Sequence, residues 1–169
     1  MTITVAQLTS DLRGSRESLF APLRGLNEEQ FRHVPAGESW SIATHLAHLL
    51  RTERVFSERA QLALHEDEPH VPSTRVANDD DPALAQHLAV PQMIHGLQAT
   101  RRSLEDVLAA CDDTRLQRAV IHERLGRMTI VQLADKMATH EAEHAADVAR
   151  LAAQAPVTRP MIIPLAEQR

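Results

Sequence analysis

The chain has 169 residues, a length that suits one domain with a substantial core. Its formal net charge is −5 and only 2% of its residues are aromatic, so it lacks the basic stripe and the stacking aromatics of nucleic-acid binders. No apolar run reaches the roughly 18 residues of a transmembrane helix, and the N-terminal stretch lacks the apolar core of a signal peptide, so no membrane partner is expected. The single cysteine, Cys111, excludes an internal disulfide and, with these absences, predicts a cytoplasmic protein.

Apolar residues at three- and four-residue spacing predict four long helices in a glycine-poor chain. The predicted helices cover about residues 4–24, from Ser39 or Ser41 to about 64, 91–110 and 130–154. Ser39 and Thr129 are candidate N-caps of the second and fourth helices, and Pro91 suits the first turn of the third helix. The four helices predict an all-α fold, a four-helix bundle.

The connectors between these helices differ in length and character. Residues 65–82 are polar, carry three prolines and exceed most connections in compact domains, so we predict a lid or a crossover there. A short helix is expected at 83–89. Residues 111–128 are expected to form an irregular connector with a turn at Gly126. The order of the helices around the bundle stays open, because periodicity does not determine it.

A single domain is expected over residues 1–169, with a proline-rich tail at 155–169. The apolar segment MIIPL in this tail is expected to dock on the body of the domain or on a second copy of the chain. The second alternative predicts a homodimer.

Two histidines stand four residues apart on the fourth predicted helix, where its apolar stripe calls for aliphatic residues. At this spacing His140 and His144 share one helix face, about 6 Å apart along the axis, so both can bind one ion. Burying two unpartnered imidazoles costs a few kcal/mol, and a shared cation offsets that cost. The alternative is a pair of surface or hydrogen-bonded histidines.

The second predicted helix offers two further candidates, His45 and His48. Its strongest apolar arc lies closer to His45, so periodicity favours His45 as the inward residue. Trp40, just before this helix, is expected to pack the helix start against the bundle. From the residues alone, the choice between the two histidines stays open.

Two stretches resemble the DinB-like superfamily of metal-binding four-helix bundles, whose relatives include mycothiol-dependent maleylpyruvate isomerase and bacillithiol transferases. In the first stretch, His48 follows Trp40-Ser41-Ile42 and stands eight residues beyond the tryptophan, the spacing of the family's first metal ligand. The second stretch runs from LGRMT at 125–129 through an apolar helix to HEAEH at 140–144. Each motif alone is weak, but their order and separation along most of the chain are specific.

The resemblance implies that His48, His140 and His144 bind one divalent metal ion, zinc or nickel, with His45 as a supporting or core residue. A metal held by three protein ligands keeps a position for water or substrate. In that position it can lower the pKa of water or stabilise a thiolate. No catalytic residue beyond the ligands is assigned.

The thiol-using relatives favour a metal-dependent thiol S-transferase, or related detoxification chemistry, acting on a small-molecule substrate with a low-molecular-weight thiol as partner. Two alternatives remain open: a metal-binding stress or interaction module without turnover, and a metal-dependent hydrolase.

Several charged residues are candidates for supporting roles around the metal. Glu141 and Glu143 flank the ligands, and Glu143 and Asp147 are expected either to orient an imidazole or to form a solvated acidic face. Basic residues near the open position would favour an acidic thiol. The candidates, each otherwise a surface residue, are Arg51, Arg54, Arg75 and Arg101. The polar segment 65–82 is expected to border the entrance of the site.

Overall fold

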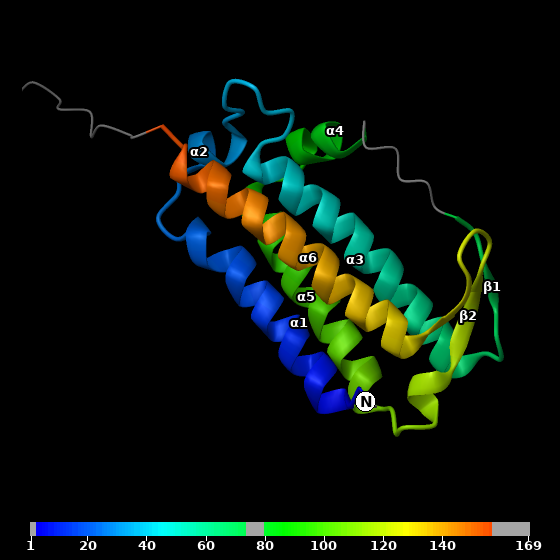
Figure 1. Cartoon of the computed structure of the whole chain (residues 1–169). Coiled ribbons are helices and arrows are strands. Elements are labelled where there is room, and N and C mark those ends of the chain that lie inside the picture. Colours follow the sequence, from blue (N-terminus) through cyan, green and yellow to red (C-terminus); the bar gives the residue numbers. More distant parts are fainter. Residues whose placement is uncertain (1–2, 74–79, 157–169) are drawn as a thin grey trace, which may run out of the picture.

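The computed structural model describes residues 3–73 and 80–156, and four long helices build its body (Figure 1). The long helices are α1 (Val5–Phe20), α3 (Ile42–His65), α5 (Val90–Ala109) and α6 (Ile130–Ala153). The other elements are α2 (Glu28–Arg32), α4 (Asp80–His87), β1 (His70–Val71), β2 (Ala119–His122), β3 (Gly126–Thr129) and two 3-10 turns at Ala21–Leu23 and Arg115–Gln117. The predicted all-α four-helix bundle is confirmed. The apolar segment at 161–165, which was predicted to dock on the domain or on a second copy, lies outside the described residues.

Side chains at the helix starts explain where the long helices begin. The Thr129 hydroxyl accepts from the Gln132 amide at 3.2 Å, and the Gln132 side chain accepts from the Thr129 amide at 2.9 Å, so the predicted cap of α6 is present as a capping box. At α3 the cap is Ser41, whose hydroxyl accepts from the Thr44 amide at 3.1 Å. The prediction of Ser39 is wrong, because the backbone becomes helical only after Ser41.

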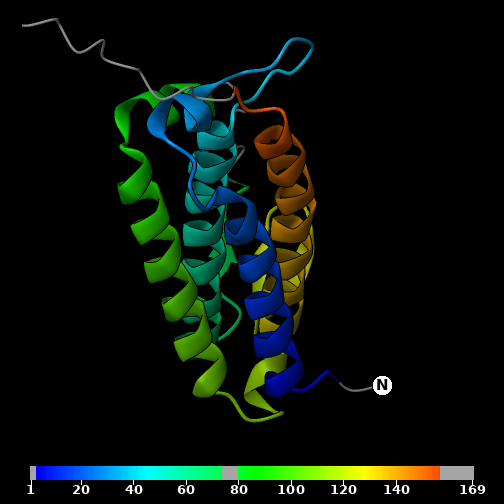
Figure 2. The same cartoon turned by 90° about the vertical axis from the view of Figure 1, so that its left-hand side faces the viewer.

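The helices are arranged with a crossover. Helix α1 packs against α5 and α6, and α3 packs against the same two helices, so α1 and α3 lie diagonally opposite each other. Figures 1 and 2 show that α1 and α6 run in one direction while α3 and α5 run in the other. The connection from α3 to α5 therefore joins two parallel helices, which requires the long connector to return along the bundle.

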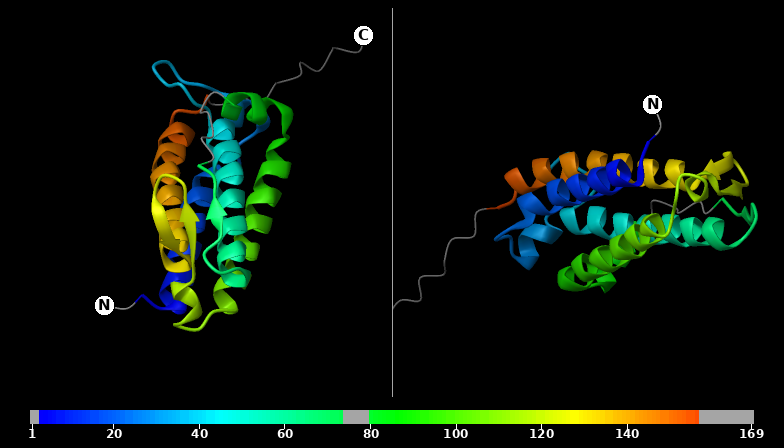
Figure 3. Two further views of the ribbon diagram at one scale, coloured as in Figure 1. Left: turned by 90° about the vertical axis from the view of Figure 1, so that its right-hand side faces the viewer. Right: turned by 90° about the horizontal axis from the view of Figure 1, so that it is seen from below.

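A small three-stranded sheet stands beside α3 at the end of the bundle where α6 begins (Figure 3). Strand β1 pairs in parallel with β2, and β2 pairs with β3 as an antiparallel hairpin that precedes α6 directly. The hairpin turn ends at Gly126, whose φ of 70° favours glycine. The sequence predicted an irregular connector at 111–128, where the structure has β2 and most of β3. These strands were missed because four residues are too few to give a clear period of two.

Two arginines and two glutamates form a closed ion network in the core. Arg16 of α1 donates to Glu141 and Glu53 at 2.6 Å each, and Arg101 of α5 donates to Glu53 at 2.6 Å and to Glu141 at 2.7 Å. Both carboxylates are fully buried, one on α3 and one on α6. This charge-balanced network, the buried quartet, therefore links all four long helices.

The buried quartet corrects the expected place of Arg101 and gives the place of Glu141. Arg101, expected at the surface or at the entrance of the site, lies in the core. Glu141, which neighbours His140 in the sequence, points into the bundle and away from solvent. Among the described residues, no helix combines the length and apolar character that crossing a membrane requires.

Candidate metal centre

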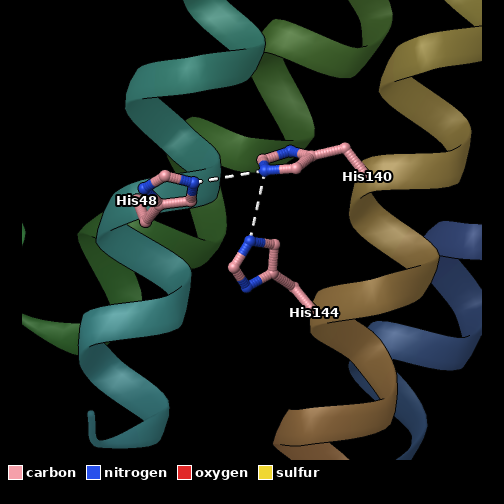
Figure 4. A group of neighbouring side chains, drawn as sticks. All are labelled: His48, His140 and His144. Atoms are coloured by element: carbon pink, nitrogen blue, oxygen red, sulfur yellow. Dashed lines mark hydrogen bonds between the residues drawn. The ribbon is translucent and has the colours of Figure 1, made fainter. Parts of the chain in front are cut away.

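Three imidazoles meet between α3 and α6 with their Nε2 atoms turned toward one another (Figure 4). The Nε2 atom of His140 lies 3.2 Å from that of His48 and 3.2 Å from that of His144. Two imidazole nitrogens on one tetrahedral zinc ion, each about 2.0–2.1 Å from it, lie roughly 3.3 Å apart. Two of the three spacings in this group of rings, the histidine triad, match that value, and the three ligand nitrogens all lie within 4.8 Å of one another, so the triad can hold a divalent ion.

Asp81 sets the tautomer of His48. Its Oδ2 lies 2.8 Å from His48 Nδ1, and its carboxylate is fully buried and also paired with Arg51. A carboxylate only accepts, so the neutral His48 ring carries its proton on Nδ1 and its lone pair on Nε2, facing the other two imidazoles. A carboxylate behind the imidazole is the arrangement that orients histidine metal ligands.

His45 supports the histidine triad without joining it. The His45 ring is buried, and its Nδ1 lies 2.8 Å from His144 Nδ1. Burial, followed by the positive field of His144, lowers the pKa of His45 to about 4, so its ring is neutral. We assign the proton of this contact to His144, which leaves His144 Nε2 as a lone pair toward the triad. Periodicity predicted His45 as the inward residue, and His45 is indeed more buried than His48. The third ring of the triad is nevertheless that of His48.

A shortage of protons in the triad favours a cation. With lone pairs on His48 and His144, the His140 Nε2 atom can supply at most one proton for two contacts. Its Nδ1 is buried and has no hydrogen-bond partner among the described residues. Burial, with His144 and His48 nearby, lowers the pKa of His140 to about 4, so a second proton is disfavoured. A divalent ion would satisfy all three lone pairs at once.

Trp40 closes one side of the triad. Its ring centroid lies 5.0 Å from that of His45 and 5.2 Å from that of His48, and its plane is within 9° of the His144 ring. The tryptophan therefore packs against the imidazoles themselves as well as holding the start of α3. Its apolar surface limits water on this side of the site.

A cavity of about 410 Å³ opens on another side, and His48 and His140 form part of its wall. The rest of the wall comes from α3, the β2–β3 turn and the first half of α6. Ser73 lines it too, so the described end of the segment 65–82 borders the site, as Asp81 does from α4. An ion in the triad would therefore face space for a substrate.

The other sequence candidates lie elsewhere. Arg51 pairs with Asp81, Arg54 pairs with Glu58, and both line a separate groove between α3 and α5. Arg75 lies outside the described residues. The Cys111 thiol bonds to a carbonyl at the end of α5, and burial raises its pKa, so it is no nucleophile for this site.

Comparison with known proteins agrees with this fold. A family model described as the DinB superfamily matches residues 11–148. The chain belongs to the DinB superfamily. No curated protein matches its sequence.

Two solved structures share the fold of this DinB superfamily member. YfiT from Bacillus subtilis, described as a probable metal-dependent hydrolase with an unusual four-helix bundle topology, superimposes with a TM-score of 0.72 at 16% identity, covering 89% of this chain and 86% of YfiT. TT2238, described as a four-helix bundle protein, gives a TM-score of 0.61 at 18% identity, covering 86% of this chain and 98% of TT2238. At these identities the likeness shows the fold alone.

Sequence reasoning missed Asp81, although a signal for it was present. Acidic residues before Pro82 suit the first turn of a helix, and α4 starts there instead of at residue 83. What the sequence did not reveal is that the connector returns to α3. That return places Asp81 beside His48, which lies 33 residues earlier in this DinB superfamily chain.

Proposed function

We propose that the protein is a divalent-metal-dependent enzyme that activates a low-molecular-weight thiol for transfer to an electrophilic small molecule. The observation that carries the proposal is the convergence of three Nε2 atoms at the wall of a cavity. His48, His140 and His144 would hold the ion, with zinc or nickel as the proposed metal. Bound there, the ion would lower the pKa of a thiol or a water that reaches it.

The residues around the cavity favour the thiol over water. Among the described residues that line the cavity, none is a carboxylate. Asp81, behind His48, is engaged by His48 and Arg51. A thiol that coordinates the ion loses its proton outright, whereas a coordinated water has a pKa of about 7 and is only partly deprotonated at neutral pH, with no carboxylate among the described residues of the cavity wall to take its proton. In the transfer, the thiol proton goes to solvent, a sulfur–carbon bond forms, and the leaving group departs with its electron pair.

The supporting residues have positioning roles in this proposal. Asp81 orients His48, His45 orients His144, and Trp40 excludes water from the side of the triad that it covers. Hydrolysis is the second candidate, because the structurally similar YfiT is described as a probable metal-dependent hydrolase.

Metal analysis and a substrate screen test the proposal together. We expect the purified full-length protein to bind one equivalent of zinc or nickel and, with bacillithiol, mycothiol or glutathione, to consume thiol only when an electrophile is present. Chelation should abolish consumption, and added metal should restore it. His140→Ala should abolish both binding and consumption, whereas His95→Ala, an exposed histidine on α5, should change neither.

Turnover of an ester or amide without thiol would instead establish the hydrolase. Metal binding without any turnover in either screen would leave a metal-binding module.

We further propose a homodimer, on the basis of the apolar segment at 161–165, which lies outside the described residues. Light scattering at micromolar concentration should give twice the mass of the chain. The mass of one chain would contradict the proposal.

A further inference from the structure

We propose that the cavity beside the histidine triad is a subsite for an oxyanion of the substrate, a carboxylate or a phosphate-type group, held by Arg59, Arg124 and Lys136. The inference deepens the proposed function and takes from it the identity of the cavity as a substrate site. Its physical basis, a cationic cavity with one fixed neutral donor, is independent of the metal.

The charge of the cavity wall is the first observation. Arg59 comes from α3, Arg124 from the β2–β3 turn and Lys136 from α6, so three separate elements each place one cation on the same cavity. No carboxylate is among the described residues that line it. In a chain with a net charge of −5, whose only lysine is Lys136, this gathering of positive charge is local and specific.

His122 responds to the charges around the cavity. After burial, the charge of Arg59 is the largest cause that lowers the pKa of His122; Glu123 raises this pKa, and Arg124 lowers it. Both arginines of the cavity wall therefore lie close enough to act on the His122 ring.

His122 adds a fixed neutral donor. Its Nδ1 accepts from the backbone amides of Arg124 at 3.1 Å and Leu125 at 3.2 Å, so the proton of the ring is on Nε2. His122 is 6% exposed and lines the cavity, and among the described residues its Nε2 has no hydrogen-bond partner. An N–H donor on the wall of a cationic cavity is suited to an anionic oxygen.

Arg59 is held in place by the connector. Its NH2 atom donates to the Pro72 carbonyl at 2.9 Å, and only 8% of the residue is exposed. Because a guanidinium has a rigid fork of donors, this bond fixes the plane that a carboxylate or phosphate would meet. Burial lowers the pKa of Arg59, which a bound anion would counteract.

The apolar part of the wall indicates an organic anion. Val55 and Phe56 of α3 and Leu125 of the turn line the same cavity. A second groove that includes His140 contains Lys136 and Arg127 but also Asp135 and Glu143, so its charges balance and it lacks the cationic character. The cationic and apolar side chains of this cavity together favour a ligand that has a hydrophobic body and an oxyanion. Such a ligand would lie next to the triad.

The single lysine allows a direct test. Reductive ¹³C-methylation keeps the charge of Lys136 and gives one side-chain NMR signal besides that of the N-terminal amine. Benzoate, benzamide and phenylphosphonate are titrated into the full-length protein, both with chelator and with zinc. We expect benzoate or phenylphosphonate to shift the Lys136 signal saturably in both conditions, and isosteric but neutral benzamide to bind about tenfold more weakly. The stronger of the two anions identifies the oxyanion class.

Variants connect the signal to the cavity. Arg124→Gln should weaken benzoate binding about tenfold, whereas Arg102→Gln, an exposed cation on α5 outside the cavity, should leave it unchanged. Equal binding of benzamide and benzoate, or equal effects of the two variants, would overturn the inference. Binding that requires zinc and ignores Arg124→Gln would overturn it as well, since the anion would then be a metal ligand. Anion binding with chelator present, in a protein that consumes no thiol, would leave this inference intact and reject the proposed function alone.

Discussion

At the scale of single residues, the site depends on which nitrogen of each imidazole carries a proton. Asp81 fixes this for His48, and the proton of the contact between His45 and His144 is the one we assigned to His144. Both contacts lie behind the triad, so they act on metal affinity through orientation rather than through direct binding.

Asp81→Asn tests the carboxylate behind His48. The amide keeps the shape of the side chain but removes the charge, and its NH2 group can turn toward Nδ1 and favour the wrong tautomer. We expect zinc affinity to fall about 10- to 100-fold, measured by competition with a chromophoric chelator. Asp113→Asn, on an exposed loop, is the matched control and should change nothing. Unchanged affinity in Asp81→Asn would remove this carboxylate from the site.

Paired variants decide between His45 and His48. His48→Ala removes a ring whose Nε2 faces the triad, so zinc affinity should fall by orders of magnitude. His45→Ala removes only the partner of His144 Nδ1, and the loss should stay within about 10- to 100-fold. The same competition assay measures both. The reverse order would show that His45, with His144 and Asp147, forms the stronger cation site.

At the scale of the helices, the buried quartet sets the geometry on which the triad depends. Glu141 stands beside His140 on α6 and is tied to Arg16 on α1 and Arg101 on α5. The rotation of α6 that buries Glu141 also fixes the direction of its two histidines. Buried ion pairs are weak net stabilisers, but removing one partner leaves an uncompensated charge in the core.

Glu141→Gln should therefore destabilise the fold strongly. The variant keeps the shape of the side chain but leaves the two arginines with one carboxylate, and we expect a loss of about 3–5 kcal/mol in the free energy of unfolding, measured by urea titration. Glu105→Gln breaks the exposed pair with Arg13 and should cost less than about 1 kcal/mol. Similar losses of unfolding free energy in both variants would mean that the quartet contributes no more to stability than an exposed ion pair.

Much of α6 was predictable from the sequence because its apolar stripe, cap and HxxxH motif agree. The stripe residues Ile130, Leu133 and Met137 are fully buried as predicted. The buried quartet was not predictable, because its charged residues stand in sequence contexts typical of solvated helix faces. Asp81 and His122 were missed for another reason: their roles arise from contacts between segments far apart in the chain, which local periodicity does not encode.

At the scale of the whole molecule, the histidines make stability depend on pH. The pKa values of His45 and His140 are lowered to about 4 in the folded protein, whereas an exposed histidine titrates near 6.5. Between these values the unfolded chain binds more protons, so stability rises with pH. The contribution is fully present above about pH 6.5 and is lost as the pH falls toward about 4.

We expect the metal-free protein to unfold cooperatively at neutral pH, because the helices bury their own apolar stripes. Its free energy of unfolding should drop by a few kcal/mol between about pH 6.5 and 4. The double variant His45→Gln/His140→Gln should flatten this dependence in urea titrations across the same range. An equally steep profile in the double variant would assign the acid sensitivity to other groups.

The crossed arrangement of the helices has a consequence for the newly made chain. Helices α1 and α3 are diagonal, as are α5 and α6, and α3 and α5 are parallel, so no two successive long helices form an antiparallel hairpin. Helix α6, the last of these four helices to leave the ribosome, completes the surfaces of both α1 and α3. Until α6 is made, the earlier helices keep part of their apolar faces uncovered, and folding should be slower than in bundles built from local hairpins. Because His140 and His144 arrive with α6, the ion can be captured only after the other three long helices have been made.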